Sequence, residues 1–151
     1  MELSLKQFVE PFLEQAKSSD LTVGKYPKDY MGLKVLVSFG KGNVAKVPWI
    51  AFLSPGQKVS EGIYPILLLY KGAGVLVLAY GVSEVNRPRL SWELVNTPTI
   101  ESYAKSCDVK MEKYRTSLFH SSYDINNPIP WELLSKRLDE VIQTYRNVLQ
   151  S

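Results

Sequence analysis

The sequence predicts a single α+β domain over residues 1–151, in which a mainly antiparallel, curved sheet is flanked by an N-terminal and a C-terminal helix. Apolar residues recur every three or four positions near both ends of the chain, as on one face of an amphipathic helix. Between these ends lie four apolar runs. The turns that join the runs are too short for the helical crossovers of parallel strands, so neighbouring strands should pair antiparallel.

The first helix is expected over residues 4–18. Ser4 and Gln7 have the spacing of a capping box, in which each side chain bonds the backbone N–H of the other residue. Pro11 lies inside the pattern, and we expect a kink or a split there because proline lacks an N–H and crowds the preceding turn. The apolar face of this helix consists of Leu5, Phe8, Val9, Phe12, Leu13 and Ala16.

Four strands are expected between the helices, at residues 33–39, 47–53, 63–70 and 75–82. In the first of them, Leu33, Val35 and Val37 alternate with a mixed set of residues, which is the period of a strand with one buried face. The sequence Gly40-Lys41-Gly42-Asn43 follows as a turn, since glycine and asparagine tolerate a positive φ. The first two strands should therefore form a hairpin or a looped pair.

Beyond these strands we expect a short helix at residues 97–106, one more strand at 118–123, and a long closing helix from Trp131 to Leu149. Pro130 suits the first turn of the closing helix, where a missing N–H costs nothing. No repeat or linker interrupts the order helix, sheet, helix, which favours one domain.

Composition favours a reduced protein of the cytoplasm. Lysine and arginine (18) exceed aspartate and glutamate (15), and the net charge of +3 by itself argues against a strong polyanion binder. Cys107 is the only cysteine, so no intramolecular disulfide can form. Residues 1–10 lack the pattern of a signal peptide, and the longest apolar run, residues 64–70, is far shorter than the ~20 residues of a membrane span. We therefore expect no membrane partner.

Few residues suit catalysis or metal binding. One histidine, His120, and one cysteine, Cys107, do not make a zinc site, which normally recruits several such ligands. A Cys107–His120 nucleophilic pair is the alternative to a half-buried cysteine and a surface histidine, and we favour the second interpretation. Gly40-Lys41-Gly42 lacks the spacing of a phosphate-binding loop and precedes a strand rather than a helix. We expect a binding domain that is not an enzyme and has no metal or cofactor.

Aromatic residues on the expected strands are the more informative feature. Tyr64 and Leu68 are four residues apart in one strand, so their side chains should share a face, and a neighbouring strand could bring Trp49 beside them. Such a cluster is often simple core. Nearby lysines favour a polyanion as ligand; they are Lys34, Lys41, Lys46 and Lys58.

The central part of the chain resembles a known family. The strings SFGKGNVAKVPWIAFL (38–53), GIYPILLLYK (62–71), LAYGVS (78–83) and NRP (86–88) are similar to the N-terminal DNA-recognition domain of McrB. Proteins of the McrB family are the specificity and GTPase subunits of the McrBC modification-dependent restriction system. The similarity is nearly free of gaps from Tyr26 to Trp92 and weaker in both terminal helices.

The resemblance implies a reader of methylated DNA. Domains of this family bind duplex DNA with 5-methylcytosine preceded by a purine, and flip the modified base into a pocket. The pocket positions fall on Trp49, Tyr64, Leu68 and Tyr114. Two aromatic faces can stack on the base, and an apolar side chain can contact its methyl group. Contacts to the DNA groove and backbone are expected from Gly40, Lys41, Gly42, Asn43, Lys46, Ser60 and Gly62.

One position departs from the family pattern. Where the best-known member carries an aromatic residue between the two glycines, to fill the gap left by the flipped base, this chain has Lys41. Lysine can reach a phosphate, and its methylene stem can occupy space, but it has no ring to stack. The sequence therefore does not identify the residue that fills the space left by the flipped base.

Other functions remain as alternatives. The ligand could be another modified base, such as 5-hydroxymethylcytosine or N6-methyladenine, or a single-stranded nucleic acid. A base-excising enzyme would need an acid near the flipped base, for which Glu61 or Glu84 are candidates. A protein-interaction module would use the polar face of the closing helix.

The family also implies partners outside this chain. The recognition domain would be attached to an AAA+ GTPase module of the same subunit, which binds GTP and Mg²⁺ and works with an McrC-type nuclease. The protein would act in the prokaryotic cytoplasm, associated with the nucleoid when bound to DNA.

Overall fold

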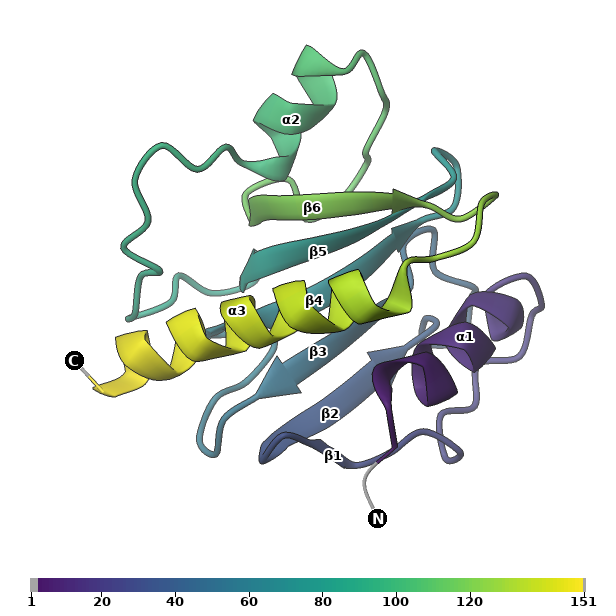
Figure 1. Ribbon diagram of the computed structural model, residues 1–151, viewed down its shortest axis with the longest axis horizontal. Helices are drawn as coiled ribbons and strands as arrows, with labels where there is room; N and C mark the ends of the chain where they lie inside the picture. The colour runs from purple at the N-terminus through teal and green to yellow at the C-terminus, as the bar shows by residue number, and fades with distance from the viewer. Residues whose placement is uncertain (1–2, 151) are drawn as a thin grey trace.

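A six-stranded antiparallel sheet forms the centre of the molecule, in a computed structural model that describes residues 3–150 (Figure 1). The strands are β1 (Asp29–Tyr30), β2 (Leu33–Ser38), β3 (Trp49–Leu53), β4 (Ile63–Tyr70), β5 (Val75–Val82) and β6 (Leu118–Asp124). They lie in the sheet in chain order, each antiparallel to its neighbours. The predicted α+β fold with flanking helices is confirmed; residues 1, 2 and 151 of the predicted domain lie outside the described part.

Two helices cover one face of this sheet. In Figure 1, α1 (Leu5–Gln15) and α3 (Trp131–Gln150) both lie in front of the strands, whereas α2 (Ile100–Ser106) lies beyond β6. The faces of α1 and α3 that carry their predicted apolar residues are buried in the same cluster as the strands. The opposite face of the sheet is thus free of these two helices.

The ends of α1 follow from its sequence. The predicted capping box is present: the Ser4 hydroxyl accepts from the Gln7 N–H at 3.3 Å, and the Gln7 side chain accepts from the Ser4 N–H at 2.7 Å. The predicted split at Pro11 is wrong, because α1 runs unbroken through it. Proline removes only the bond to the carbonyl of Gln7, and Gln7 is exposed to water.

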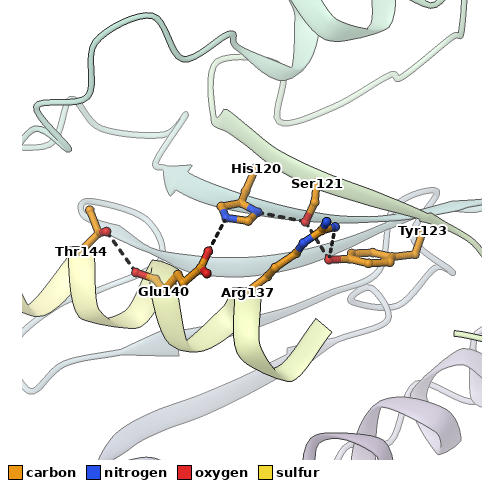
Figure 2. A network of polar contacts seen from close by, with 6 residues as sticks. All are labelled: His120, Ser121, Tyr123, Arg137, Glu140 and Thr144. Atoms are coloured by element: carbon orange, nitrogen blue, oxygen red, sulfur yellow. Dashed lines mark hydrogen bonds and ion pairs between the residues drawn. The ribbon is translucent and has the colours of Figure 1, made fainter. Parts of the chain in front are cut away.

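Tyrosine and charged side chains attach α3 to the sheet. The buried Tyr145 accepts a hydrogen bond at its hydroxyl from the Ser54 N–H at 3.0 Å. Figure 2 shows a second group of contacts, in which His120 Nε2 lies 3.5 Å from Glu140 Oε2 and Arg137 donates to the Tyr123 hydroxyl at 3.3 Å. These contacts link β6 to the middle of α3.

The interpretation of Cys107 and His120 is corrected by the structure. Cys107 is exposed rather than half-buried, since it caps the end of α2. The side chain of His120 is only 16% exposed, because the register shift between β5 and β6 places this residue opposite α3, where it meets Glu140 and the ring of Tyr80. His120 is thus a half-buried strand residue rather than a surface residue.

Two further observations bear on function classes. Within residues 3–150, no three side chains of His, Cys, Asp or Glu lie close enough together to hold a metal ion. The same part of the chain has no helix with the length and apolar character needed to cross a bilayer.

The first prediction concerns pH. Burial lowers the pKa of His120 from 6.5, opposed by the contact with Glu140, and Arg137 lowers it further. The unfolded chain therefore binds a proton at His120 more tightly than the folded one, so the free energy of unfolding should fall as pH drops through about 6.5 toward the lowered pKa. Urea denaturation at a series of pH values measures this, and His120→Gln should flatten the dependence. Equal pH dependence in both proteins would contradict the assignment.

Candidate functional site

The aromatic residues singled out in the sequence lie on the sheet face opposite α1 and α3. Trp49 on β3 is directly paired with Leu68 on β4, and Tyr64 lies four residues before Leu68 on the same strand. Because side chains alternate along a strand, all three belong to one face. Trp49 thus lies beside Leu68, on the face that also carries Tyr64.

An open pocket of about 730 Å³ lies on this face, and we call it the aromatic pocket. Trp49, Tyr64 and Tyr114 all line it, so residues from β3, β4 and the loop after α2 meet there. Leu68 is fully buried and is not among the lining residues; it lies in the sheet beside Trp49. The structure thus brings three of the four predicted pocket residues to one surface and places the fourth within the sheet.

Trp49 and Tyr114 both line the pocket and influence each other. Burial raises the pKa of the Tyr114 hydroxyl, the indole N–H of Trp49, which can only donate, opposes this rise, and the charge of Glu84 adds to it. The hydroxyl is therefore protonated at neutral pH and keeps its own proton to donate to a ligand.

The position of Tyr114 depends on a distant strand residue. Tyr114 has a left-handed backbone with φ of 59°, which is uncommon for a bulky side chain. The hydroxyl of Tyr70, at the end of β4, donates to the carbonyl of the preceding residue, Lys113, at 2.6 Å. This bond holds the loop against the sheet, and the strained backbone turns the aromatic ring toward Trp49.

Tyr64 forms a fixed wall of the pocket. Its hydroxyl donates to the carbonyl of Val59 at 2.9 Å, which ties β4 to the turn before it. Its ring lies over Gly81 on β5, where an added Cβ would be 2.9 Å from two ring carbons. Only glycine leaves room for this ring, and burial raises the pKa of its hydroxyl.

The loop between β2 and β3 contributes to the pocket edge. Gly40 and Lys41 line the pocket, whereas Asn43 is exposed and outside the lining. Gly40 has φ of 115°, and a Cβ there would lie 2.0 Å from the Asn43 carbonyl oxygen. Glycine is thus required for the tight loop that presents Lys41 beside the aromatic rings.

The other predicted contact residues are placed differently. Lys46 lies 3.4 Å from the carboxylate of Glu112 and lines a neighbouring hollow with Tyr70 rather than the aromatic pocket. Ser60 is exposed at the pocket, while Gly62 is buried under the side chain of Gln57. The ion pair of Lys46 could not be seen in the sequence, because Glu112 is far away along the chain.

The charges around the pocket are mainly positive. Lys34, Lys41 and Lys58 line it, and among residues 3–150 none of them has a carboxylate within ion-pair distance. Glu84 is the single acidic residue of the lining. Sequence reasoning missed Leu36 as an apolar part of the wall, although it lies two residues from Lys34 in β2, and therefore on the same face.

Fold and site together define a single-domain α+β protein with an aromatic, lysine-lined pocket on the helix-free face of an antiparallel sheet. The family model described as "MrcB-like, N-terminal domain" matches residues 7–112. The chain is also 36% identical over 152 aligned residues to the "Type IV methyl-directed restriction enzyme EcoKMcrB subunit" of Escherichia coli strain K12, with 98% of this chain aligned. The chain belongs to the MrcB-like N-terminal domain family, and it spans 33% of the length of that relative.

The two loop glycines provide a matched test of the site geometry. Gly40→Ala should lower the free energy of unfolding by more than about 2 kcal/mol, because its Cβ meets backbone at 2.0 Å. Gly42→Ala should cost only about 1 kcal/mol, because it also has a positive φ, 77°, but no atom within 4 Å of the added Cβ. Chemical denaturation measures both, and equal losses would show that the tight loop is not as described.

Proposed function

We propose that this domain binds duplex DNA that carries a methylated cytosine and holds the modified base, flipped out of the helix, in the aromatic pocket. It would serve as the targeting module of a restriction system. The observation that carries the proposal is the pocket itself: Trp49, Tyr64 and Tyr114 lie around one opening whose lining also contains three lysines, Lys34, Lys41 and Lys58.

Chemistry supports a base as the ligand. The pocket volume of about 730 Å³ falls within the range of about 300–1,000 Å³ typical of small-molecule sites. Stacking of a base on an aromatic ring contributes about 1–3 kcal/mol, and burial of one methyl group about 0.8 kcal/mol. These values predict a preference for the methylated base of a few fold to about tenfold rather than complete rejection of unmodified cytosine.

The family supports DNA as the partner. The relative from Escherichia coli is named as a methyl-directed restriction enzyme subunit, and this chain aligns with a third of it. On the proposal, an AAA+ GTPase module of the same subunit and an McrC-type nuclease would supply GTP hydrolysis and DNA cleavage in the cytoplasm. This domain would bind no cofactor of its own and would carry out no chemistry on the base.

The direct test compares duplexes that differ in a single 5-methylcytosine preceded by a purine. Wild-type protein should bind the methylated duplex more tightly, by a few fold to about tenfold, at one stated salt concentration. Trp49→Ala should bring the ratio close to one, because the stacking surface is lost. Trp131→Ala is the matched control, since that tryptophan lines a hollow beside α1 on the other side of the sheet.

Fluorescence anisotropy gives the affinities, and circular dichroism shows whether each variant is folded. A folded Trp49→Ala protein that keeps the wild-type ratio would remove this residue from the site. A wild-type protein with equal affinity for both duplexes at every salt concentration would overturn methyl recognition.

The lysines should act on affinity without affecting base preference. Lys41→Ala should weaken binding to methylated and plain duplexes alike and reduce the slope of log K against log salt by about 1, because one phosphate contact is lost. Lys46→Ala should have a smaller effect, because its ammonium group already faces Glu112. Lys17→Ala, in the turn after α1, is the control. A lysine variant that changes the methylated-to-plain ratio would contradict a pure backbone role.

Lys41 gives a specific reason to test other ligands, since it stands where an aromatic plug is expected. Competition with duplexes containing 5-hydroxymethylcytosine or N6-methyladenine, and with single strands, measures the specificity of the pocket. If one of these competes better than 5-methylcytosine, that ligand replaces it in the proposal. Formation of abasic sites on incubation with modified duplex would instead show a base-excising enzyme.

A further inference from the structure

The segment that follows β5 brings a carboxylate to the aromatic pocket. Glu84 lines the pocket, and hydrogen bonds on both sides of it fix the segment to the turn before β4. The Ser83 N–H donates to the Gly62 carbonyl at 3.0 Å, and Asn86 donates to the Ser60 carbonyl from its backbone at 3.1 Å and from its side chain at 3.2 Å. Glu84 is therefore presented by a backbone anchored at both ends.

The negative charge of Glu84 acts on tyrosine hydroxyl groups of the pocket wall. Burial raises the pKa values of Tyr64 and Tyr114 first, and the negative charge of Glu84 raises both further. Burial also raises the pKa of Tyr70 beneath the loop, and the charge of Glu84 raises it further. Three hydroxyls from different parts of the wall thus lie within electrostatic reach of one carboxylate.

This carboxylate has no structural partner. Within the described residues, 3–150, Glu84 forms no ion pair and its side chain accepts no hydrogen bond. Three lysines line the same pocket, and their charge offsets the repulsion between Glu84 and an approaching phosphate backbone. Glu84 is exposed at the pocket, so its carboxylate is available to accept a hydrogen bond from a ligand.

The Tyr114 hydroxyl provides a hydrogen-bond donor in the same pocket as the Glu84 carboxylate. Burial raises the pKa of the Tyr114 hydroxyl, so the group is protonated at neutral pH and can donate to a ligand. The pocket thus offers a carboxylate that can only accept and a hydroxyl that can donate.

We infer that Glu84, together with the Tyr114 hydroxyl, selects bases that present an exocyclic amine next to a ring-nitrogen acceptor. Cytosine has this edge, with its N4 amine and N3, and adenine has the same order with its N6 amine and N1. Thymine and guanine present a carbonyl beside a ring N–H. In the same orientation, their carbonyl would meet the Glu84 carboxylate, which can only accept, and their ring N–H would meet the Tyr114 hydroxyl that donates. This inference rests on the proposed function and adds the atoms that distinguish cytosine from thymine, since both can carry a C5 methyl group.

The test removes the contribution of base pairing. Two duplexes carry either 5-methylcytosine or thymine at the target position, each opposite an abasic site, so that neither base has to be unpaired before it enters the pocket. Wild-type protein should prefer 5-methylcytosine by about tenfold or more. Glu84→Gln should bring the ratio close to one, because a carboxamide both accepts and donates and can therefore bond either edge.

Glu61→Gln is the matched control. It makes the same change of charge at an exposed residue two positions from the pocket strand, and Glu61 is outside the pocket lining. This variant should keep the wild-type ratio of 5-methylcytosine to thymine. A loss of the ratio in both variants would assign the effect to net charge and overturn the role of Glu84.

The failures of the two proposals are distinguishable. A wild-type protein that prefers methylated over plain duplex but does not distinguish 5-methylcytosine from thymine would overturn the inference and leave methyl recognition intact. A Glu84→Gln protein that keeps the wild-type preference for 5-methylcytosine over thymine would also overturn the inference and leave methyl recognition intact. A wild-type protein that fails to distinguish methylated from plain duplex would overturn the proposed function itself.

Discussion

The burial of β4 on both faces is the constraint on which the rest of the structure depends. All eight residues from Ile63 to Tyr70 are buried. A strand in the middle of an antiparallel sheet can be buried on both sides only if other parts of the chain cover both faces. The helices α1 and α3 cover one face, and α2 with its following loop covers part of the other. The remaining opening on that second face, over β2 and β3, is where the aromatic pocket lies.

This arrangement explains why the pocket combines rigid and adjustable parts. Tyr64 belongs to the buried strand, and its position is fixed by Val59 and by the glycine under its ring. Tyr114 belongs to a loop and reaches the pocket through a single anchor, the bond between the Tyr70 hydroxyl and the Lys113 carbonyl. The position of Tyr64 is therefore fixed by the core itself, whereas the position of Tyr114 depends on one hydrogen bond between its loop and the core.

The sequence predicted the elements with strong local signals. The bounds of β4 and β5 agree with prediction: Gly62 directly precedes β4 and Gly74 directly precedes β5, and the capping box marked the start of α1. The two-residue β1 has no periodicity to detect and was not predicted. In the site, the shared face of Tyr64 and Leu68 followed from alternation. The pairing of Trp49 with Leu68, the ion pair of Lys46 and the surroundings of Glu84 depend on contacts between separate segments that no local pattern encodes.

The attachment of the pocket loops has a consequence for molecular design. The turn before β4, the segment after β5 and the loop at Lys113 are all joined to one another or to the sheet through main-chain carbonyl groups, at Val59, Ser60, Gly62 and Lys113. Apart from the side chain of Asn86, which donates to the Ser60 carbonyl, these bonds use only main-chain groups of the loops. Other loop sequences that keep Asn86 could therefore be grafted onto the same sheet, so that the lining of the pocket could be altered without redesigning the core.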